Sequence, residues 1–260
     1  MSPDHPISQD LPPEPPAAVN QPAAAPIFRP YVTYILIGVC ALVYILQIGT
    51  QSLLGRDILA LVGVKDNALI LQGQFWRLFT PMFLHSDQTP LHIAVNMYAL
   101  FFIGRTVERF YGRRRYLGLF ILSGFAGNVI SFMFSSYDSL GSSTSIFGLL
   151  GAEGVLIYQN REIFGPIARQ ALSQIVIVAV ANLVIGLSPA LGIDNWGHIG
   201  GLIGGTLFAW FGGPVLKRLG NVPPYPVVNT RTGREVLRAG VGVGALFFFL
   251  TVAVLFMRRG

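Results

Sequence analysis

The chain has 260 residues, of which 52% are hydrophobic and 12% are charged, and its formal net charge is +6. A soluble globular protein carries about 25% charged residues, so this composition excludes a soluble domain. Nucleic acid is not an expected partner, because the basic residues stand beside apolar runs, which is typical of membrane topology signals.

The first segment, residues 1–30, is rich in proline and alanine and contains almost no large apolar side chains. Such a segment cannot bury enough surface to offset the entropy lost on ordering, so we expect a disordered cytoplasmic tail. Its start carries Asp4 and Asp10 and no basic run, so we do not expect a signal peptide.

Apolar stretches of about 20 residues, the length that crosses a bilayer, follow the tail. We expect membrane spans at residues 31–49, 91–110, 116–134, 143–158, 168–187, 196–215 and 239–257. The segment between the first two is too broken by polar residues to span. The prediction is an all-α polytopic membrane protein. Its parts are a membrane domain over 31–216, a cytoplasmic linker over 217–237 and a seventh transmembrane helix over 238–260.

Basic residues gather in every second loop between the predicted spans. The loop after the second span includes Arg113, Arg114 and Arg115, whereas the loop after the third holds Asp138 and no basic residue. Short loops rich in Lys and Arg stay on the cytoplasmic side. We therefore expect a cytoplasmic N-terminus and an external C-terminus in a multi-pass protein of a bacterial cell membrane.

Polar residues interrupt the edges of three spans, in the segments LHIAVN (91–96), GSSTSIFG (141–148) and NWGHIGGLIGG (195–205). Three of the four histidines, His85, His92 and His198, lie in or beside them. Polar side chains at membrane depth are costly, so they mark a candidate site. On the predicted topology, this site lies near the outer face.

The serine-rich segment favours nucleophilic chemistry at Ser143. Gly141 permits a sharp turn into the fourth span and puts Ser143 in its first turn, where unpaired N–H groups favour an oxyanion. A serine hydroxyl needs a base within hydrogen-bond reach, and His198 and His92 are the candidates. The alternative is structural, because serine is also a preferred helix cap.

The other polar residues add a second part to this site. Glycines on the fourth and sixth spans allow the close approach that a contact between Ser143 and His198 needs. His92 and Asn96 are four residues apart and share a helix face, from which both can donate to one oxyanion. Zinc held by His85, His92 and His198 is the alternative, but no HExxH-type spacing or acidic partner supports it. We therefore expect no metal and no other cofactor.

These segments resemble the rhomboid family of intramembrane serine proteases over roughly half the chain, from Trp76 to Gly205. The matching residues are Trp76 and Arg77 in the Trp-Arg motif, His92 and Asn96 in HxxxN, Ser143 in GxSG, and His198, Gly200, Gly201 and Gly205 in HxGGxxxG. The resemblance implies a six-helix core, to which the seventh predicted span is appended.

The resemblance also implies roles for individual residues. It implies a Ser143–His198 dyad with no aspartate, and oxyanion help from the Ser143 N–H, His92 and Asn96. It implies that Phe147 packs its ring against His198.

One position departs from the family pattern: Thr144 stands where the family has glycine. Ser145 is an alternative nucleophile, but only Ser143 keeps the family spacing to Gly141 and Gly148. Glu153 is not explained by the resemblance, and we expect it to be protonated or paired within the bundle, for instance with Asn128 or a backbone group.

The expected function is hydrolysis of peptide bonds in or near transmembrane helices of membrane-protein substrates. One alternative is a catalytically inactive rhomboid-like adaptor or quality-control protein. Another is a small-molecule transporter, whose polar residues would lie on broken helices at mid-membrane and not near one face. The natural substrate and the oligomeric state stay open.

Overall fold

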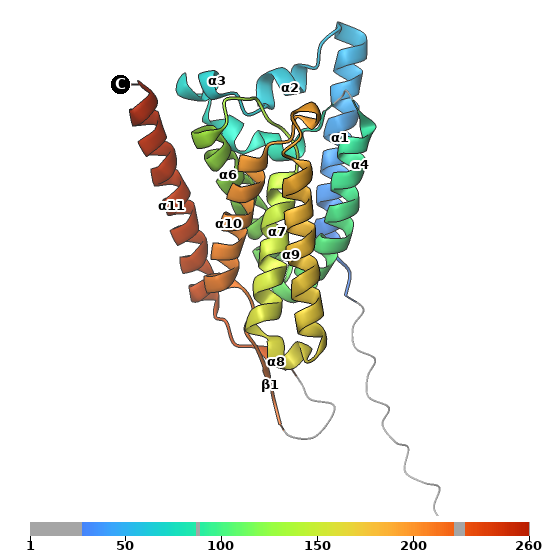
Figure 1. Ribbon diagram of the computed structural model, residues 1–260, viewed down its shortest axis with the longest axis vertical. Helices are drawn as coiled ribbons and strands as arrows, with labels where there is room; N and C mark the ends of the chain where they lie inside the picture. Colours follow the sequence, from blue (N-terminus) through green and yellow to red (C-terminus); the bar gives the residue numbers. More distant parts are fainter. Residues whose placement is uncertain (1–27, 87–88, 221–226, 260) are drawn as a thin grey trace, which may run out of the picture.

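A computed structural model describes residues 28–86, 89–220 and 227–259 and is mainly helical (Figure 1). Nearly all of the predicted tail, residues 1–30, lies outside these ranges. The main helices are α1 (Tyr31–Leu54), α4 (Pro90–Ala99), α5 (Arg105–Tyr111), α6 (Arg113–Phe134), α7 (Ser143–Gln159), α9 (Ile167–Ile185), α10 (Asn195–Gly212) and α11 (Gly233–Arg259). A π-helical stretch, Leu100–Gly104, joins α4 and α5 into one continuous helix.

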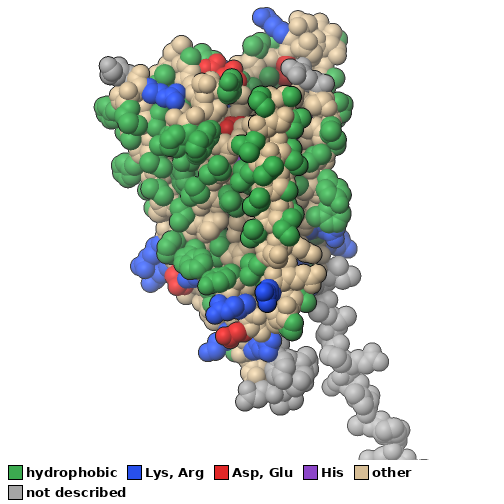
Figure 2. Space-filling view, viewed as in Figure 1, with side chains coloured by type: hydrophobic (Ala, Val, Ile, Leu, Met, Phe, Trp, Pro, Cys, Tyr) green, Lys and Arg blue, Asp and Glu red, His purple; other side chains and the backbone are tan. Residues whose placement is uncertain are grey.

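Four of the described helices, α1, α6, α9 and α11, are each long and apolar enough to cross a membrane. In the space-filling view, hydrophobic side chains cover the middle of the molecule, and Lys and Arg side chains gather mainly at its lower end (Figure 2). The chain is therefore a multi-pass integral membrane protein. Helices α7 and α10 lie near the centre of the bundle, between α11 on one side and α1 on the other (Figure 1).

The closest helix packing in the core joins α7 to α10 and depends on glycine. A Cβ atom at Gly205 would lie 2.2 Å from the carbonyl oxygen of Gly148, and one at Gly201 would lie 2.0 Å from that of Thr144. No side chain fits at such distances, so backbone meets backbone. A Cβ atom at Gly148 would in turn lie 2.1 Å from the Ser123 side chain of α6, so α6 packs against the same glycine through a side chain.

The polar segment between α1 and α4 is folded into short helices, not a span. They are α2 (Ile58–Gly63), α3 (Asn67–Leu71), η1 (Phe75–Leu78) and η2 (Thr80–Phe83). Asp57 and Asp66 begin α2 and α3, because their carboxylates accept the otherwise unpaired N–H groups of Ala60 and Leu69.

Buried cations hold this segment together and to the bundle. Arg77 donates to the carbonyl oxygens of Val64 at 2.8 Å and Leu61 at 2.6 Å. Lys65 is fully buried and donates to the Tyr137 carbonyl at 2.5 Å. Burial lowers the pKa of the Lys65 amine. These bonds join the segment to the turn before α7, where the candidate nucleophile lies.

The last part of the chain differs from the predicted boundaries. Helix α10 ends at Gly212, before Pro214, and is followed by an antiparallel pair of strands, β1 (Leu216–Arg218) and β2 (Val227–Asn229). Helix α11 begins at Gly233, inside the predicted linker. The reason is a capping box: Glu235 accepts from the Thr232 backbone N–H at 2.8 Å, and Thr232 Oγ1 accepts from the Glu235 N–H at 3.3 Å.

Candidate active site

Ser143 is the first residue of α7, and a glycine turn puts it there. Gly141 has φ +132°, a conformation that L side chains rarely adopt. Its N–H donates to the carbonyl of Pro81 in η2 at 2.9 Å, which attaches the turn to the preceding segment. Because Ser143 lies in the first helical turn, the unpaired N–H groups and positive end of α7 lie beside its hydroxyl.

His198 lies in the first turn of α10, and its Nε2 is 2.8 Å from Ser143 Oγ. Its ring stacks on the ring of Phe147 with a centroid distance of 4.2 Å and an interplanar angle of 10°. Since Phe147 is one turn after Ser143 on the same helix, α7 supplies both the hydroxyl and the surface that orients the imidazole. The histidine is 7% exposed, so solvent reaches little of it.

An aspartate fixes the start of α10. Asp194 Oδ1 accepts the N–H of Gly197 at 3.0 Å, and Asp194 Oδ2 accepts a hydrogen bond from Ser131 of α6. The helix that carries His198 is thereby capped and bound to a neighbouring helix. Within the described residues no carboxylate hydrogen-bonds to His198, so the arrangement is a serine–histidine pair and not a triad.

His92 approaches the same turn from α4. A Cβ atom at Gly141 would lie 3.0 Å from His92 Nε2 and 3.6 Å from Ser143 Oγ. His92 Nδ1 accepts the backbone N–H of Ser86 at 3.3 Å, which leaves the proton of a neutral ring on Nε2. The ring can therefore donate toward the space beside Ser143.

Asn96 lies one turn after His92 and is buried. Its Nδ2 donates to the His92 carbonyl at 2.9 Å, which uses one of the two N–H bonds of the amide. The structure thus brings Asn96 to His92, and among the described residues no hydrogen bond joins it to Ser143.

The neighbouring polar residues of the turn point elsewhere. Ser145 Oγ contacts Met82 Sδ at 3.9 Å, so its hydroxyl is directed away from His198. Thr144 packs between α6 and α10: Cβ atoms at Gly127 and Gly197 would lie 2.8 and 3.0 Å from its side chain. Two glycines therefore provide the room for the threonine that departs from the family pattern.

Sequence reasoning missed a second polar network behind the turn. His85 is fully buried, and its Nε2 lies 3.2 Å from Ser142 Oγ. The Gln47 side chain of α1 accepts the His85 N–H at 3.0 Å and donates to the His85 carbonyl at 2.9 Å. Gln47 also donates to Asp57 at 2.6 Å. The signal that could have found it is a glutamine inside an apolar run, because such a group needs a buried partner.

The histidine of this network is neutral. Burial lowers the pKa of His85 to about 3, so its ring is uncharged at neutral pH. His85 and His92 meet edge to face with ring centroids 5.4 Å apart. In the described ranges no group of three His, Cys, Asp or Glu side chains is placed to hold a metal ion.

The expected pairing of Glu153 with Asn128 is not found. The Asn128 amide instead donates to the carbonyl of Leu78 in η1 at 3.0 Å. Asn128 therefore joins α6 to the segment that precedes the site, and no hydrogen bond between it and Glu153 is found in the described part of the chain.

Known proteins match this chain across the same region. The family model of the Rhomboid domain matches residues 72–215. Rhomboid protease GluP of Bacillus subtilis (strain 168) is 36% identical over 222 residues, which are 85% of this chain and 41% of that protein.

Two plant proteins, both from Arabidopsis thaliana, are also similar. RHOMBOID-like protein 4 is 37% identical over 187 residues, which are 70% of this chain and 44% of that protein. RHOMBOID-like protein 9, chloroplastic, is 38% identical over 157 residues, or 60% of this chain and 36% of that protein. The chain spans less than half the length of each of these three relatives.

Proposed function

The chain belongs to the rhomboid family, and on that premise we propose that it is an intramembrane serine endopeptidase. It hydrolyses peptide bonds in or near the transmembrane helices of membrane-protein substrates. One observation carries the proposal: Ser143 Oγ and His198 Nε2 lie 2.8 Å apart on two helices at the centre of a membrane bundle. A hydroxyl in hydrogen-bond contact with an imidazole is the arrangement that nucleophilic catalysis needs.

In the proposed reaction, Ser143 Oγ attacks the scissile carbonyl carbon while its proton passes to His198 Nε2. The negative oxygen that forms is stabilised by the Ser143 N–H at the start of α7, by His92 Nε2–H and by Asn96. The histidine then gives its proton to the leaving amine, and water hydrolyses the acyl-enzyme by the same route in reverse. Gly141 and Phe147 support the site by fixing the turn and the imidazole. No metal or cofactor is required.

The proposed topology has seven spans. Six form the core, with α4 and α5 counted as one, and α11 is the seventh. The arginine-rich end faces the cytoplasm, and Ser143 lies near the outer face of a bacterial membrane. The domain limits proposed from the sequence change only in the linker, because α11 begins at Gly233.

Accessibility of introduced cysteines tests this topology. Cys40 is the only cysteine and is buried, so it gives little background. In intact cells, a cysteine replacing Asp138 should react with a membrane-impermeant maleimide, whereas one replacing Arg114 should react only after permeabilisation. Labelling of the Arg114 position from outside would reverse the proposed orientation.

Cleavage of a reporter tests the activity. The reporter is a membrane protein with one transmembrane helix that carries glycine near its outer end, where the helix is easily unwound. The wild-type chain should cut it, and Ser143→Ala should not, whereas Ser145→Ala should retain activity. A folded wild-type protein that cuts none of a panel of such reporters would favour the inactive, adaptor-like reading.

The need for unwinding is a separate part of the proposal. A transmembrane helix satisfies its own backbone hydrogen bonds, so its peptide bonds are shielded until the helix opens. Replacing the glycine near the cut with leucine should therefore slow cleavage more than it weakens binding. Equal cleavage of a uniformly leucine-rich helix would show that opening is not required.

A further inference from the structure

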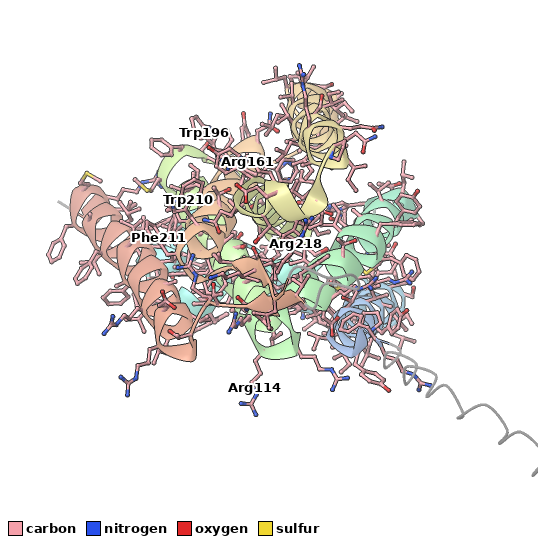
Figure 3. All side chains as sticks on the ribbon, turned by 90° about the horizontal axis from the view of Figure 1, so that it is seen from below. Arg114, Arg161, Trp196, Trp210, Phe211 and Arg218 are labelled. Atoms are coloured by element: carbon pink, nitrogen blue, oxygen red, sulfur yellow. The ribbon has the colours of Figure 1, made fainter. Side chains whose placement is uncertain are left out.

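A pocket lies at the arginine-rich end of the molecule, on the opposite side of the membrane domain from Ser143. Its volume is about 400 Å³. It is formed by the end of α7, by α8 (Arg161–Phe164) and by strand β1. The lining residues that carry the argument are Gln159, Asn160, Arg161, Glu162, Lys217 and Arg218. Figure 3 looks onto this end of the molecule and labels Arg161 and Arg218.

The two walls of the pocket are bonded to each other. Asn160 is buried, and its Oδ1 accepts the N–H of Leu216 at 2.6 Å while its Nδ2 donates to the carbonyl of Pro214 at 3.0 Å. Arg218 donates to the carbonyl of Glu162 at 3.1 Å. These bonds run between α7 or α8 and the β1 region, so the pocket is set by the fold.

The pocket carries an excess of positive charge. Arg161, Lys217 and Arg218 line it, against the single carboxylate of Glu162. Across the described residues, the one ion pair is Arg231 with Glu235, so neither Arg161 nor Lys217 is neutralised by a carboxylate within 4.0 Å. Arginine and lysine placed around a concave site are suited to bind a phosphate group.

A hydrogen-bond acceptor lies beside these cations. Gln159 Nε2 donates to the Trp210 carbonyl at 3.0 Å, but Gln159 Oε1 is buried and accepts no hydrogen bond from the described protein. A buried acceptor that stays unpaired is costly. A ligand that offers a hydroxyl next to its phosphate would satisfy it, as a glycerol headgroup does.

Aromatic side chains place the pocket at the edge of the bilayer. The guanidinium of Arg161 lies over the Tyr158 ring, 5.3 Å from its centroid, and Tyr158 stacks with Trp210 at 5.9 Å. Tyr158, Trp210 and Phe211 are all exposed on the surface. Amphipathic aromatic rings collect at the headgroup level of membranes, and apolar ones face acyl chains.

From this combination we propose that the pocket binds the phosphate of an anionic glycerophospholipid such as phosphatidylglycerol. The cations hold the phosphate, Gln159 accepts from the glycerol hydroxyl, and the acyl chains lie against Tyr158, Trp210 and Phe211. The aromatic surface favours a lipid over free phosphate, because inorganic phosphate has no apolar part that could lie against it. This site does not depend on the proposed proteolysis.

Native mass spectrometry of the full chain, exchanged into detergent with equal amounts of phosphatidylglycerol and phosphatidylcholine, tests the proposal. The wild-type chain should retain phosphatidylglycerol preferentially. Each basic residue near an anionic lipid contributes roughly a fivefold effect, so Arg161→Gln/Lys217→Gln should lower retention about 25-fold. The control, Arg114→Gln/Arg234→Gln, removes two exposed charges from the same end but outside the pocket and should lower it less than about threefold.

A charge-preserving variant and a competitor separate the remaining outcomes. Arg161→Lys/Lys217→Arg should retain phosphatidylglycerol, which shows that charge and not folding is measured. Equal losses in the pocket variant and the control would overturn the proposal in favour of general attraction to a basic surface. Displacement of the lipid by millimolar inorganic phosphate, with no preference between the two lipids, would also overturn it and identify free phosphate as the ligand.

Discussion

Helix α7 has two very different neighbours. It meets α10 backbone to backbone through glycines, and the Ser143–His198 contact lies at the start of both helices. Its packing against α9 is looser: a Cβ atom at Gly154 would lie 3.7 Å from the Ile175 side chain, and α9 buries just Ala168 and Ala179. A hydrogen bond of 2.8 Å between two helices needs a separation that does not vary, which glycine contacts enforce. A helix such as α9, which packs loosely, cannot impose that accuracy but can face lipid.

The largest expected effect falls on the α7–α10 pair itself. Ser143→Ala and His198→Ala should each lower the rate of reporter cleavage about 10⁴-fold or more, and the double variant should be no worse than either. The reason is that proton transfer needs both groups at once. The matched control is Ser173→Ala, which removes an exposed serine from α9 and should leave the rate unchanged. Additive losses in the double variant would mean that the two residues act separately.

The second prediction concerns the contribution of α4 to the site formed by α7 and α10. Asn96→Ala should lower the cleavage rate about 10²–10³-fold, because an oxyanion donor contributes that much. Steady-state kinetics should show the loss in kcat more than in KM. An unchanged rate would remove Asn96 from the site and leave the Ser143 N–H and His92 as donors.

The third prediction concerns the contact that holds the pair together. Gly205→Ala should destabilise the protein by about 1–3 kcal/mol, because overpacking costs that much and the new Cβ would lie 2.2 Å from the Gly148 oxygen. Thermal unfolding in detergent measures the change. Gly118→Ala on α6 is the control, since a Cβ there meets nothing within 4 Å. Equal stability of the two variants would contradict the close approach of α7 and α10.

The smallest effect on stability is expected for a substitution on α9, the other neighbour of α7. Ile177→Ala on α9 removes an exposed apolar side chain and should change stability by less than about 0.5 kcal/mol. Cleavage should stay close to the wild-type rate, because α9 supplies nothing to the Ser143 site. A loss as large as that of Gly205→Ala would show that α9 is packed as firmly as α10.

The length of the apolar stretches was enough to predict a helical membrane protein, and the prediction of this class of protein is confirmed. It could not predict the ends of the last elements. Residues 233–238 include a glycine and three charged side chains, so their hydropathy predicts a linker, whereas a hydrogen bond between Thr232 and Glu235 begins the helix there. A hydropathy pattern indicates which residues lie in lipid, but it does not detect the hydrogen bonds that cap the start of a helix.

The contact between Ser143 and His198 could be anticipated, because each residue stands in a motif of glycines at one end of a span. For the network of Gln47, His85 and Asp57, the sequence offers only one signal, the glutamine inside an apolar run. The partner of this glutamine could not be predicted, because Gln47 and His85 are 38 residues apart and join through the backbone of His85. The pocket proposed to bind lipid could not be predicted for the same reason, since α8 and β1 are far apart in the chain and meet only in the fold.

Covalent labelling with a fluorophosphonate measures the reactivity of Ser143 most directly. The purified chain is treated with the probe, and mass spectrometry locates the adduct. Labelling is expected on Ser143 in the wild-type protein and should be lost in both Ser143→Ala and His198→Ala. An adduct on Ser145, or labelling of Ser143 that continues at the wild-type rate in His198→Ala, would contradict a catalytic pair formed by α7 and α10.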